Sequence, residues 1–188
     1  MEWPEKYKCV SKEFVIEINE FKIVPIRYQD RYLIMKWRNE QLYHLRQENS
    51  LTKKDQDFYF EKIIKEQFDE FNPNQILVSF LKNNKCIGYG GLVHINWRDK
   101  NAEISFIIDT KLEKDYFNFY WGIFLKMIEN FGFSFINMNK LYVYSFNLRP
   151  KLYEVLLDSK YIKEASLKNH VFYNDKFVDV YIHSKFSN

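Results

Sequence analysis

The chain has 188 residues, 46% of them hydrophobic, and a formal net charge of +3 from 28 basic and 25 acidic side chains. With only 5 Gly and 4 Pro, this composition indicates a globular domain and excludes a disordered or collagen-like chain. The balanced charge excludes a general nucleic-acid binder. No apolar run approaches the ~18 residues of a membrane span, and residues 1–6 lack a signal-peptide core. We therefore expect a cytoplasmic protein without membrane insertion.

Periodicity predicts two strands followed by a helix at the start of the chain. The alternation of apolar and polar residues indicates the strands. Near Asp30, the expected N-cap, the pattern becomes helical, with Leu33, Ile34 and Trp37 on the buried face. The predicted strands are residues 14–18 and 21–26.

The rest of the chain is predicted to contain three further helices and six further strands. Thr52 and Asp55 form the capping box of a second helix, which Asn72-Pro73-Asn74 ends. Three antiparallel strands follow, then a helix, a strand, a helix and a closing hairpin. The buried stripe of the second helix is Phe60, Ile63, Ile64 and Phe68. The elements are expected at 52–68, 75–81, 86–95, 102–108, 116–133, 141–146, 149–159, 161–172 and 177–184.

This order predicts an α+β (mixed α/β) fold with a twisted, mostly antiparallel sheet flanked by helices. The helix between the strands at 102–108 and 141–146 makes that pair parallel. We expect one domain over residues 1–188, with 1–20 as an N-terminal extension. Cys9 and Cys86 lack metal-ligand spacing and are expected to be free thiols, and the four dispersed histidines predict no metal site.

Several short segments occur in the order found in one enzyme family. The residues Cys86 to Leu92 (CIGYGGL) and Asn101 to Phe106 (NAEISF) are similar to that family's third and fourth strands. Tyr161 to Ala165 (YIKEA) and Lys176 to Val180 (KFVDV) are similar to its closing hairpin. Over residues 21–184, the chain therefore resembles the GNAT N-acetyltransferases.

One segment resembles a particular branch of that family. Ile34 to Asn39 (IMKWRN) is similar to bacterial acetyltransferases of nucleotide-linked amino sugars, such as the pseudaminic-acid-pathway type, and to those of ribosomal-protein N-termini. The resemblance implies a GNAT-like fold that takes acetyl-CoA as co-substrate between the two parallel strands, which should splay. The residues that it places beside acetyl-CoA are Phe106, Ile107, Ile108, Lys114, Asn118, Asn147 and Arg149.

The chain departs from the family pattern at the expected pyrophosphate site. The family signature Gln/Arg-x-x-Gly-x-Gly/Ala should follow the fourth strand, but residues 110–118 contain no glycine. Without glycine, the usual anion-binding backbone nest must be altered. Lys111 and Lys114 either supply charge there or are solvated surface residues. Leu156 stands where the family often has an acid tyrosine, and Tyr153, one turn earlier, either substitutes for it or packs.

Glu103 is the candidate catalytic base. A carboxylate set in an apolar strand can have a raised pKa and accept the amine proton, directly or through water. The alternative is a strand-end carboxylate that faces solvent or pairs with a lysine. His94, near the end of the preceding strand, is a second candidate for proton relay, although a lone strand histidine is more often structural.

The candidate acceptor side starts on the first helix. Arg38 can hold a phosphate or carboxylate in two-point contact, whereas Trp37 either stacks on a ring or packs in the core. Gly90 and Gly91 indicate either a bulge or a close backbone approach, which in the family admits substrate. The candidate substrate-binding residues are Trp37, Arg38, Asn39, Arg46 and Gly90.

The expected function is acetyl-CoA-dependent N-acetylation of a nucleotide-linked amino sugar for surface glycan biosynthesis. The expected partner is thus a small-molecule substrate, with a homodimer possible and no nucleic acid. Two alternatives remain open. One is a protein N-terminal acetyltransferase, which would prefer an open acidic groove for a basic peptide and for which Glu66, Asp69 and Glu70 offer only weak support. The other is a non-catalytic binding protein of the same fold.

Overall fold

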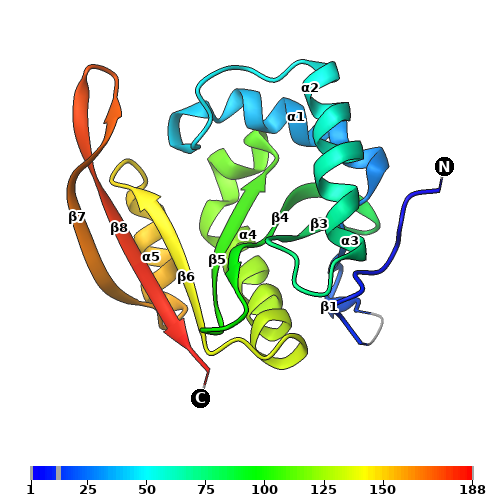
Figure 1. The fold of residues 1–188 in the computed structure, drawn as a ribbon. Coiled ribbons are helices and arrows are strands. Elements are labelled where there is room, and N and C mark those ends of the chain that lie inside the picture. Colours follow the sequence, from blue (N-terminus) through cyan, green and yellow to red (C-terminus); the bar gives the residue numbers. More distant parts are fainter. Residues whose placement is uncertain (1, 12–13, 188) are drawn as a thin grey trace.

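Within residues 2–11 and 14–187, which the computed structural model describes, eight strands form one sheet in the order β1-β2-β3-β4-β5-β6-β8-β7 (Figure 1). The strands are β1 (Ile16–Ile18), β2 (Phe21–Pro25), β3 (Ile76–Lys82), β4 (Lys85–Asn96), β5 (Asn101–Ile108), β6 (Lys140–Phe146), β7 (Ile162–Tyr173) and β8 (Lys176–Phe186). The α-helices are α1 (Arg31–Glu40), α2 (Lys53–Phe58), α3 (Lys65–Asp69), α4 (Thr110–Asn130) and α5 (Pro150–Asp158). The shorter helical segments are η1 (Tyr28–Asp30), η2 (Leu42–His44), η3 (Tyr59–Ile64) and η4 (Phe131–Phe135).

Neighbouring strands in the described sheet pair antiparallel except β5 and β6, which are parallel. The predicted α+β class and the predicted parallel pair are therefore confirmed, with α4 as the crossover helix. The predicted β3–β4 hairpin is also present. Asn83 and Asn84 at its turn both have positive φ, as a type I′ turn requires.

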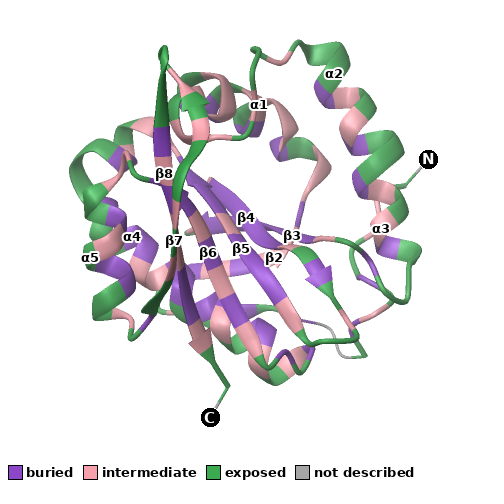
Figure 2. Ribbon diagram, turned by 60° about the vertical axis from the view of Figure 1, so that its left-hand side comes forward, coloured by how far each residue is buried: buried purple, intermediate pink, exposed green. Residues whose placement is uncertain are grey.

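The sheet lies between two layers of helices. Figure 2 shows α4 and α5 on one face of the sheet and α1, α2 and α3 on the other. On the α4 face, Phe106 of β5 stacks on Phe124 with ring centroids 3.9 Å apart, and Phe80 of β3 meets Phe124 edge-on. On the opposite face, Ile34 and Trp37 of α1 are buried. The core thus fixes β5 between both layers.

Gly90 and Gly91 of β4 allow close backbone approach. A Cβ atom at Gly90 would lie 2.2 Å from the carbonyl oxygen of Ser105, and one at Gly91 would lie 2.1 Å from that of Ile76. Gly91 also has a φ of +145°. The bulges of β4 lie elsewhere, near its start and between Val93 and Asn96. The close approach, and not a bulge, therefore explains this pair.

The predicted helix at 52–68 is one helical run with a π-helical segment, η3, in its middle. Its capping box is confirmed, since Thr52 Oγ1 accepts from the Asp55 N–H and the Asp55 carboxylate accepts from the Thr52 N–H. Two residues predicted to be buried are not, because Ile63 is 40% exposed and Leu33 of α1 is 44% exposed. Their neighbours Ile64 and Ile34 occupy the core positions instead.

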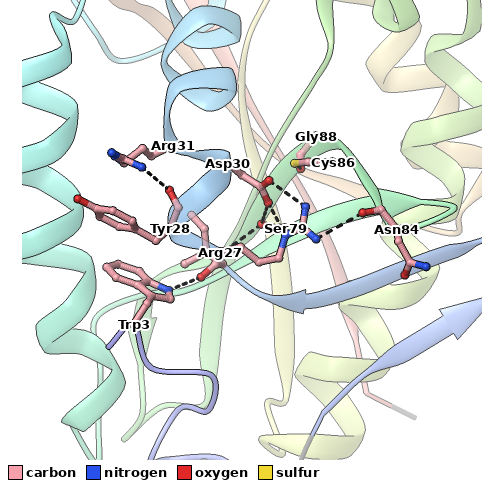
Figure 3. Close-up of polar contacts among 10 residues, drawn as sticks. Trp3, Arg27, Tyr28, Asp30, Arg31, Ser79, Asn84, Cys86 and Gly88 are labelled. Atoms are coloured by element: carbon pink, nitrogen blue, oxygen red, sulfur yellow. Dashed lines mark hydrogen bonds and ion pairs between the residues drawn. The ribbon is translucent and has the colours of Figure 1, made fainter. Parts of the chain in front are cut away.

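Asp30 occupies the predicted N-cap position of the first helix, but its side chain does not cap it. Asp30 has helical φ and ψ, and its side chain caps no backbone N–H. Its buried carboxylate accepts from Nε and Nη2 of Arg27 at 2.8 Å and from the Ser79 hydroxyl at 2.7 Å, as Figure 3 shows. The cluster fastens the start of α1 to β3. Cys86 lies beside it as a free thiol whose pKa burial raises, and Cys9 is also free.

The helix after β5 starts earlier than predicted, at Thr110 and not near residue 116. Asp109 is its N-cap, and the Asp109 side chain accepts from the Lys111 N–H. Tyr116 has non-helical φ and ψ, which separates a first helical turn from the rest of α4. The stretch without the expected glycine signature thus folds as a helical turn.

Residues 2–11 pack against the rest of the domain. The Trp3 indole donates to the Ile26 carbonyl oxygen, and the Tyr7 ring stacks on Phe68 at 3.9 Å. The buried Tyr7 hydroxyl also donates to and accepts from the backbone of Leu77. In the described part of the chain, no helix is long and apolar enough to cross a membrane.

Candidate active site

The parallel strands β5 and β6 diverge beside a cavity. They pair only over Asn101–Glu103 and Lys140–Tyr142, so the predicted splay is present. After Glu103 and Tyr142, the backbone groups of the two strands face an opening instead of each other. A cavity of about 180 Å³ fills this opening and reaches both helical layers. Its lining includes Arg46, Ser105, Phe106, Trp121, Tyr144 and Ser145.

Glu103 is the one carboxylate among the described residues that line this cavity. Its side chain is 7% exposed, and Arg46 Nη2 donates to its Oε1 in an ion pair. His94 Nε2 lies 3.9 Å from its other oxygen. Burial raises the pKa of Glu103, and the charge of Arg46, together with that of a protonated His94, opposes the rise. A buried carboxylate that lines a cavity is a candidate to accept a proton from a substrate.

Arg46 covers Glu103 from the outside. It belongs to the irregular segment between η2 and α2, and its side chain is 48% exposed. The guanidinium carbon lies 4.7 Å from the centroid of the Tyr144 ring. Arg46 therefore separates the buried carboxylate from the molecular surface.

Two further cavities open on the side of Arg46 and α1. One has a volume of about 250 Å³ and is lined by Arg38, Tyr59 and Tyr89 among others. The other, of about 400 Å³, is lined by Arg46, Glu103, Lys140, Tyr142 and Tyr144 among others. His94 lines both cavities. Its φ of +50° lies at the second β4 bulge, which turns the strand where the cavities meet.

Arg38 is held in place by neutral partners. Its Nη1 donates to the Tyr89 hydroxyl at 2.6 Å, and its Nε donates to the Gln47 side chain at 2.7 Å. Both partners are neutral, so these two contacts leave the positive charge of the guanidinium unbalanced. Arg38 is thus a fixed cation at the junction of the first and second cavities.

The N-termini of α4 and α5 frame a fourth cavity, of about 430 Å³. Arg149 Nη2 donates to the buried Glu113 carboxylate at 2.6 Å, and the Tyr43 hydroxyl donates to the same oxygen at 3.2 Å. Lys114 and Lys151 supply positive charge to the lining, whereas the charge of Arg149 is balanced by Glu113, which lines the same cavity. The two lysines are suited to bind an anion without a glycine-rich loop.

His44 completes this network as a neutral ring. Its Nδ1 lies 3.2 Å from Arg149 Nη1, which can only donate, so Nδ1 accepts and the proton resides on Nε2. Nε2 then donates to Gln41 Oε1 at 3.3 Å. Burial, followed by the charge of Arg149, lowers the pKa of His44 to about 3. The segment after α1 is thereby tied to α5.

The structure brings Arg38, Arg46, His94 and Glu103 together but places other predicted acceptor residues elsewhere. Trp37 is buried in the core, and Gly90 lies against β5 and α4. The Asn39 side chain bonds both backbone groups of Leu51 and anchors the loop before α2. Within the described cavities, none of these three residues is part of the lining.

The predicted donor-side residues are also divided. Phe106 lines the cavity between the strands, while Lys114 and Arg149 line the one at the helix termini. The others lie apart: Ile107 and Ile108 are buried, Asn118 is exposed, and the Asn147 N–H donates to the Asp179 carbonyl oxygen. The Tyr153 hydroxyl donates to the Phe146 carbonyl oxygen at 2.9 Å, which favours its structural role.

Sequence reasoning missed Glu113, His44 and Tyr89. Glu113 looks like a solvated residue of a helical turn, and its partner Arg149 is 36 positions away. No local pattern connects the two. The absence of glycine in this stretch was the one signal of an unusual arrangement at the N-terminus of α4.

A family model described as an acetyltransferase (GNAT) domain matches residues 23–182. The chain therefore belongs to the GNAT acetyltransferase family. It is an N-acetyltransferase, and its acyl donor is acetyl-CoA. Membership in the family argues against the non-catalytic alternative.

Solved structures share the fold at low sequence identity. Spermidine N-acetyltransferase from Vibrio cholerae in complex with CoA and spermine aligns with a TM-score of 0.79 and 16% identity, over 90% of this chain and 96% of that one. The dodecameric form of the Vibrio cholerae enzyme gives 0.73 and 16%, over 90% and 95%. A probable acetyltransferase gives 0.73 and 17%, over 93% and 97%. No curated protein gives a significant match.

Proposed function

We propose that this N-acetyltransferase acetylates an amino group on an anionic, ring-bearing small molecule, namely a nucleotide-linked amino sugar used in surface glycan biosynthesis. The charge of the two cavities beside Glu103 carries this proposal. Their lining has four basic side chains, Arg38, Arg46, His94 and Lys140. Arg46 is paired with Glu103 and Lys140 with Glu164, so Arg38 is the guanidinium without an acidic partner among the described residues. Such a lining attracts phosphate groups and repels cations.

Arg38 is the residue best placed to bind the acceptor phosphate. Its Nε and Nη1 groups are used on Gln47 and Tyr89, which fix the plane of the guanidinium. Nη2 has no hydrogen-bond partner among the described residues and is free to donate to a phosphate oxygen. The rings of Tyr59 and Tyr142 line the adjoining cavities and offer faces for a sugar or a base.

A polyamine acceptor fits these cavities poorly. The Vibrio cholerae structures concern spermidine N-acetyltransferase, and one of them contains spermine. A polyamine carries several ammonium groups, which carboxylates recognise, whereas the described lining here offers Glu103 alone, already paired with Arg46. Each further ammonium would meet guanidinium or imidazole groups, which favours an anionic acceptor.

The protein N-terminal alternative has no support from the cavities. It relied on Glu66, Asp69 and Glu70 as an acidic groove for a basic peptide. All three are exposed at the end of α3 and line none of the described cavities around Glu103.

The chemistry follows from this arrangement. Glu103 takes a proton from the acceptor ammonium, and the free amine attacks the thioester carbon held between β5 and β6. Backbone N–H groups of the diverging strands polarise the carbonyl oxygen. The carbon–sulfur bond then breaks, CoA leaves as a thiolate, and the second proton of the attacking nitrogen passes to that thiolate. Because a thiol has a pKa of only ~8.5, no protein acid is needed at the Leu156 position.

The test measures CoA thiol release with a UDP-linked amino sugar, spermidine and a basic peptide as parallel acceptors. We expect the highest kcat/KM with the UDP-linked amino sugar. The Glu103→Gln variant serves as the background control for hydrolysis. A higher kcat/KM with spermidine or the peptide would refute the proposed acceptor class while leaving the acetyltransferase assignment intact.

A further inference from the structure

In the free protein, Glu103 cannot yet act on an amine. Arg46 occupies one of its oxygens, and His94 faces the other at 3.9 Å. An approaching ammonium would find this carboxylate already bonded to a guanidinium. The ion pair also stabilises the ionised form and so weakens Glu103 as a proton acceptor.

The two members of this ion pair differ in how firmly they are held. Glu103 is buried in β5, paired with Val93 of β4 on one side and Tyr142 of β6 on the other. Arg46 belongs to an irregular segment and is half exposed. Among the described contacts, the Arg46 guanidinium touches only Glu103 and the Tyr144 ring. Arg46 is therefore the partner that can move.

Arg46 lines the cavity of about 400 Å³, so its side chain has space to move away from Glu103. Lys140 also lines that cavity, but its charge is balanced by Glu164 at 2.6 Å. Arg46 is thus the guanidinium available to an anion that enters there. An Arg–phosphate contact can be bidentate and lies at the surface, where both groups keep part of their hydration.

We propose that Arg46 is a positioning residue that keeps Glu103 closed in the free enzyme and releases it when an anionic group of the acceptor takes the guanidinium. This inference rests on the proposed function. Arg46 stays protonated throughout and only changes its partner. The proton that moves passes from the acceptor ammonium to Glu103.

This arrangement makes the acceptor's anion a condition for catalysis. Once Arg46 has left, the groups facing Glu103 are His94 of β4 and Tyr142 and Tyr144 of β6. Burial then acts with less opposing charge, so Glu103 binds a proton more strongly. An amine without an attached anion does not displace Arg46 from Glu103, so it reacts slowly.

The kinetic test compares a UDP-linked amino sugar with glucosamine, an amino sugar without the nucleotide. In Arg46→Ala, we expect kcat/KM for the UDP-linked sugar to fall at least about tenfold, as loss of a charge-assisted contact implies. For glucosamine we expect kcat/KM to rise, because nothing closes Glu103. Arg98→Ala, at an exposed turn, is the matched control. An unchanged or lower value with glucosamine overturns the inference.

A second test does not depend on turnover. Carboxyl ¹³C NMR follows the titration of Glu103 in the CoA-saturated protein, with Glu103→Gln to assign the signal. We expect UDP to raise the Glu103 pKa in the wild type, and Arg46→Ala to raise it without UDP. If UDP binds by calorimetry and the pKa stays, the gating role is wrong while the acceptor class stands. If UDP does not bind, both proposals fail.

Discussion

The Arg149–Glu113 pair at the phosphate-side cavity gives a prediction whose size can be worked out. Both side chains are only 10% exposed, so water screens their 2.6 Å contact little. Replacing Arg149 by Met removes the guanidinium, whose carbon lies over the Phe117 and Trp121 rings, and leaves Glu113 without its cation. Removing one partner of a buried ion pair costs about 3–5 kcal/mol.

The hydrogen bond from Tyr43 to Glu113 remains in this variant, so we expect the lower end, about 3 kcal/mol. For a domain of this size, that lowers Tm by roughly 6–12 °C. Urea unfolding followed by far-UV circular dichroism at pH 7, without acetyl-CoA, measures the change.

The matched control removes both charges. In Glu113→Leu/Arg149→Met, no buried charge is left alone, and we expect most of the lost stability to return. A loss below about 1 kcal/mol in Arg149→Met alone would show that water already screens the pair. The network at α4 and α5 would then contribute little to stability.

Three further outcomes follow from single residues. Arg38→Ala removes the cation fixed by Tyr89 and should raise KM for the acceptor about 10- to 100-fold, with acetyl-CoA affinity unchanged by calorimetry. His44, whose pKa in the fold is about 3, binds a proton more readily when unfolded, so stability should fall by about 1–2 kcal/mol from pH 7 to pH 5, and His44→Gln should flatten that slope in urea titrations. Gly91→Ala should cost at least about 3 kcal/mol, because its φ is +145° and a Cβ would lie 2.1 Å from a β3 carbonyl oxygen, whereas Gly122→Ala, with nothing within 4 Å, should be neutral or stabilising.

Where local periodicity and local chemistry agree, the sequence was sufficient to predict the structure. The Thr52–Asp55 capping box and the Asn83–Asn84 turn depend on contacts within four residues. Asp30 has the same local chemistry as an N-cap, but its carboxylate accepts from Arg27, three residues earlier, and from Ser79 of β3. The contact with Ser79 is tertiary, and no local pattern predicts it.

Some residues of the candidate site could also be predicted from the sequence, and others could not. The family resemblance placed Glu103, Arg38 and Arg46 on the acceptor side, and the structure brings them to one place. Trp37 sits one residue before Arg38, yet a helical step of one residue turns its side chain into the core. The link from Glu113 to Arg149 spans two helix termini. Such a link depends on packing and cannot be predicted from spacing.

The role of Glu103 as base is tested most directly by Glu103→Gln. Gln keeps the size of the side chain, and its carbonyl oxygen can still accept from Arg46, so the fold should survive. Loss of a general base costs ~10²–10⁴-fold in rate, and we expect kcat/KM to fall within that range. In the wild type, kcat/KM should rise with pH as Glu103 loses its proton, at a pH above the usual carboxyl range because burial raises its pKa.

The variant should lack this acidic limb, because Gln does not titrate. A loss below about threefold, far under the general-base range, together with a retained limb, would make Glu103 structural. The amine proton would then pass to His94, 3.9 Å from Glu103, or directly to water. Catalysis would in that case rest on how the diverging strands position the thioester.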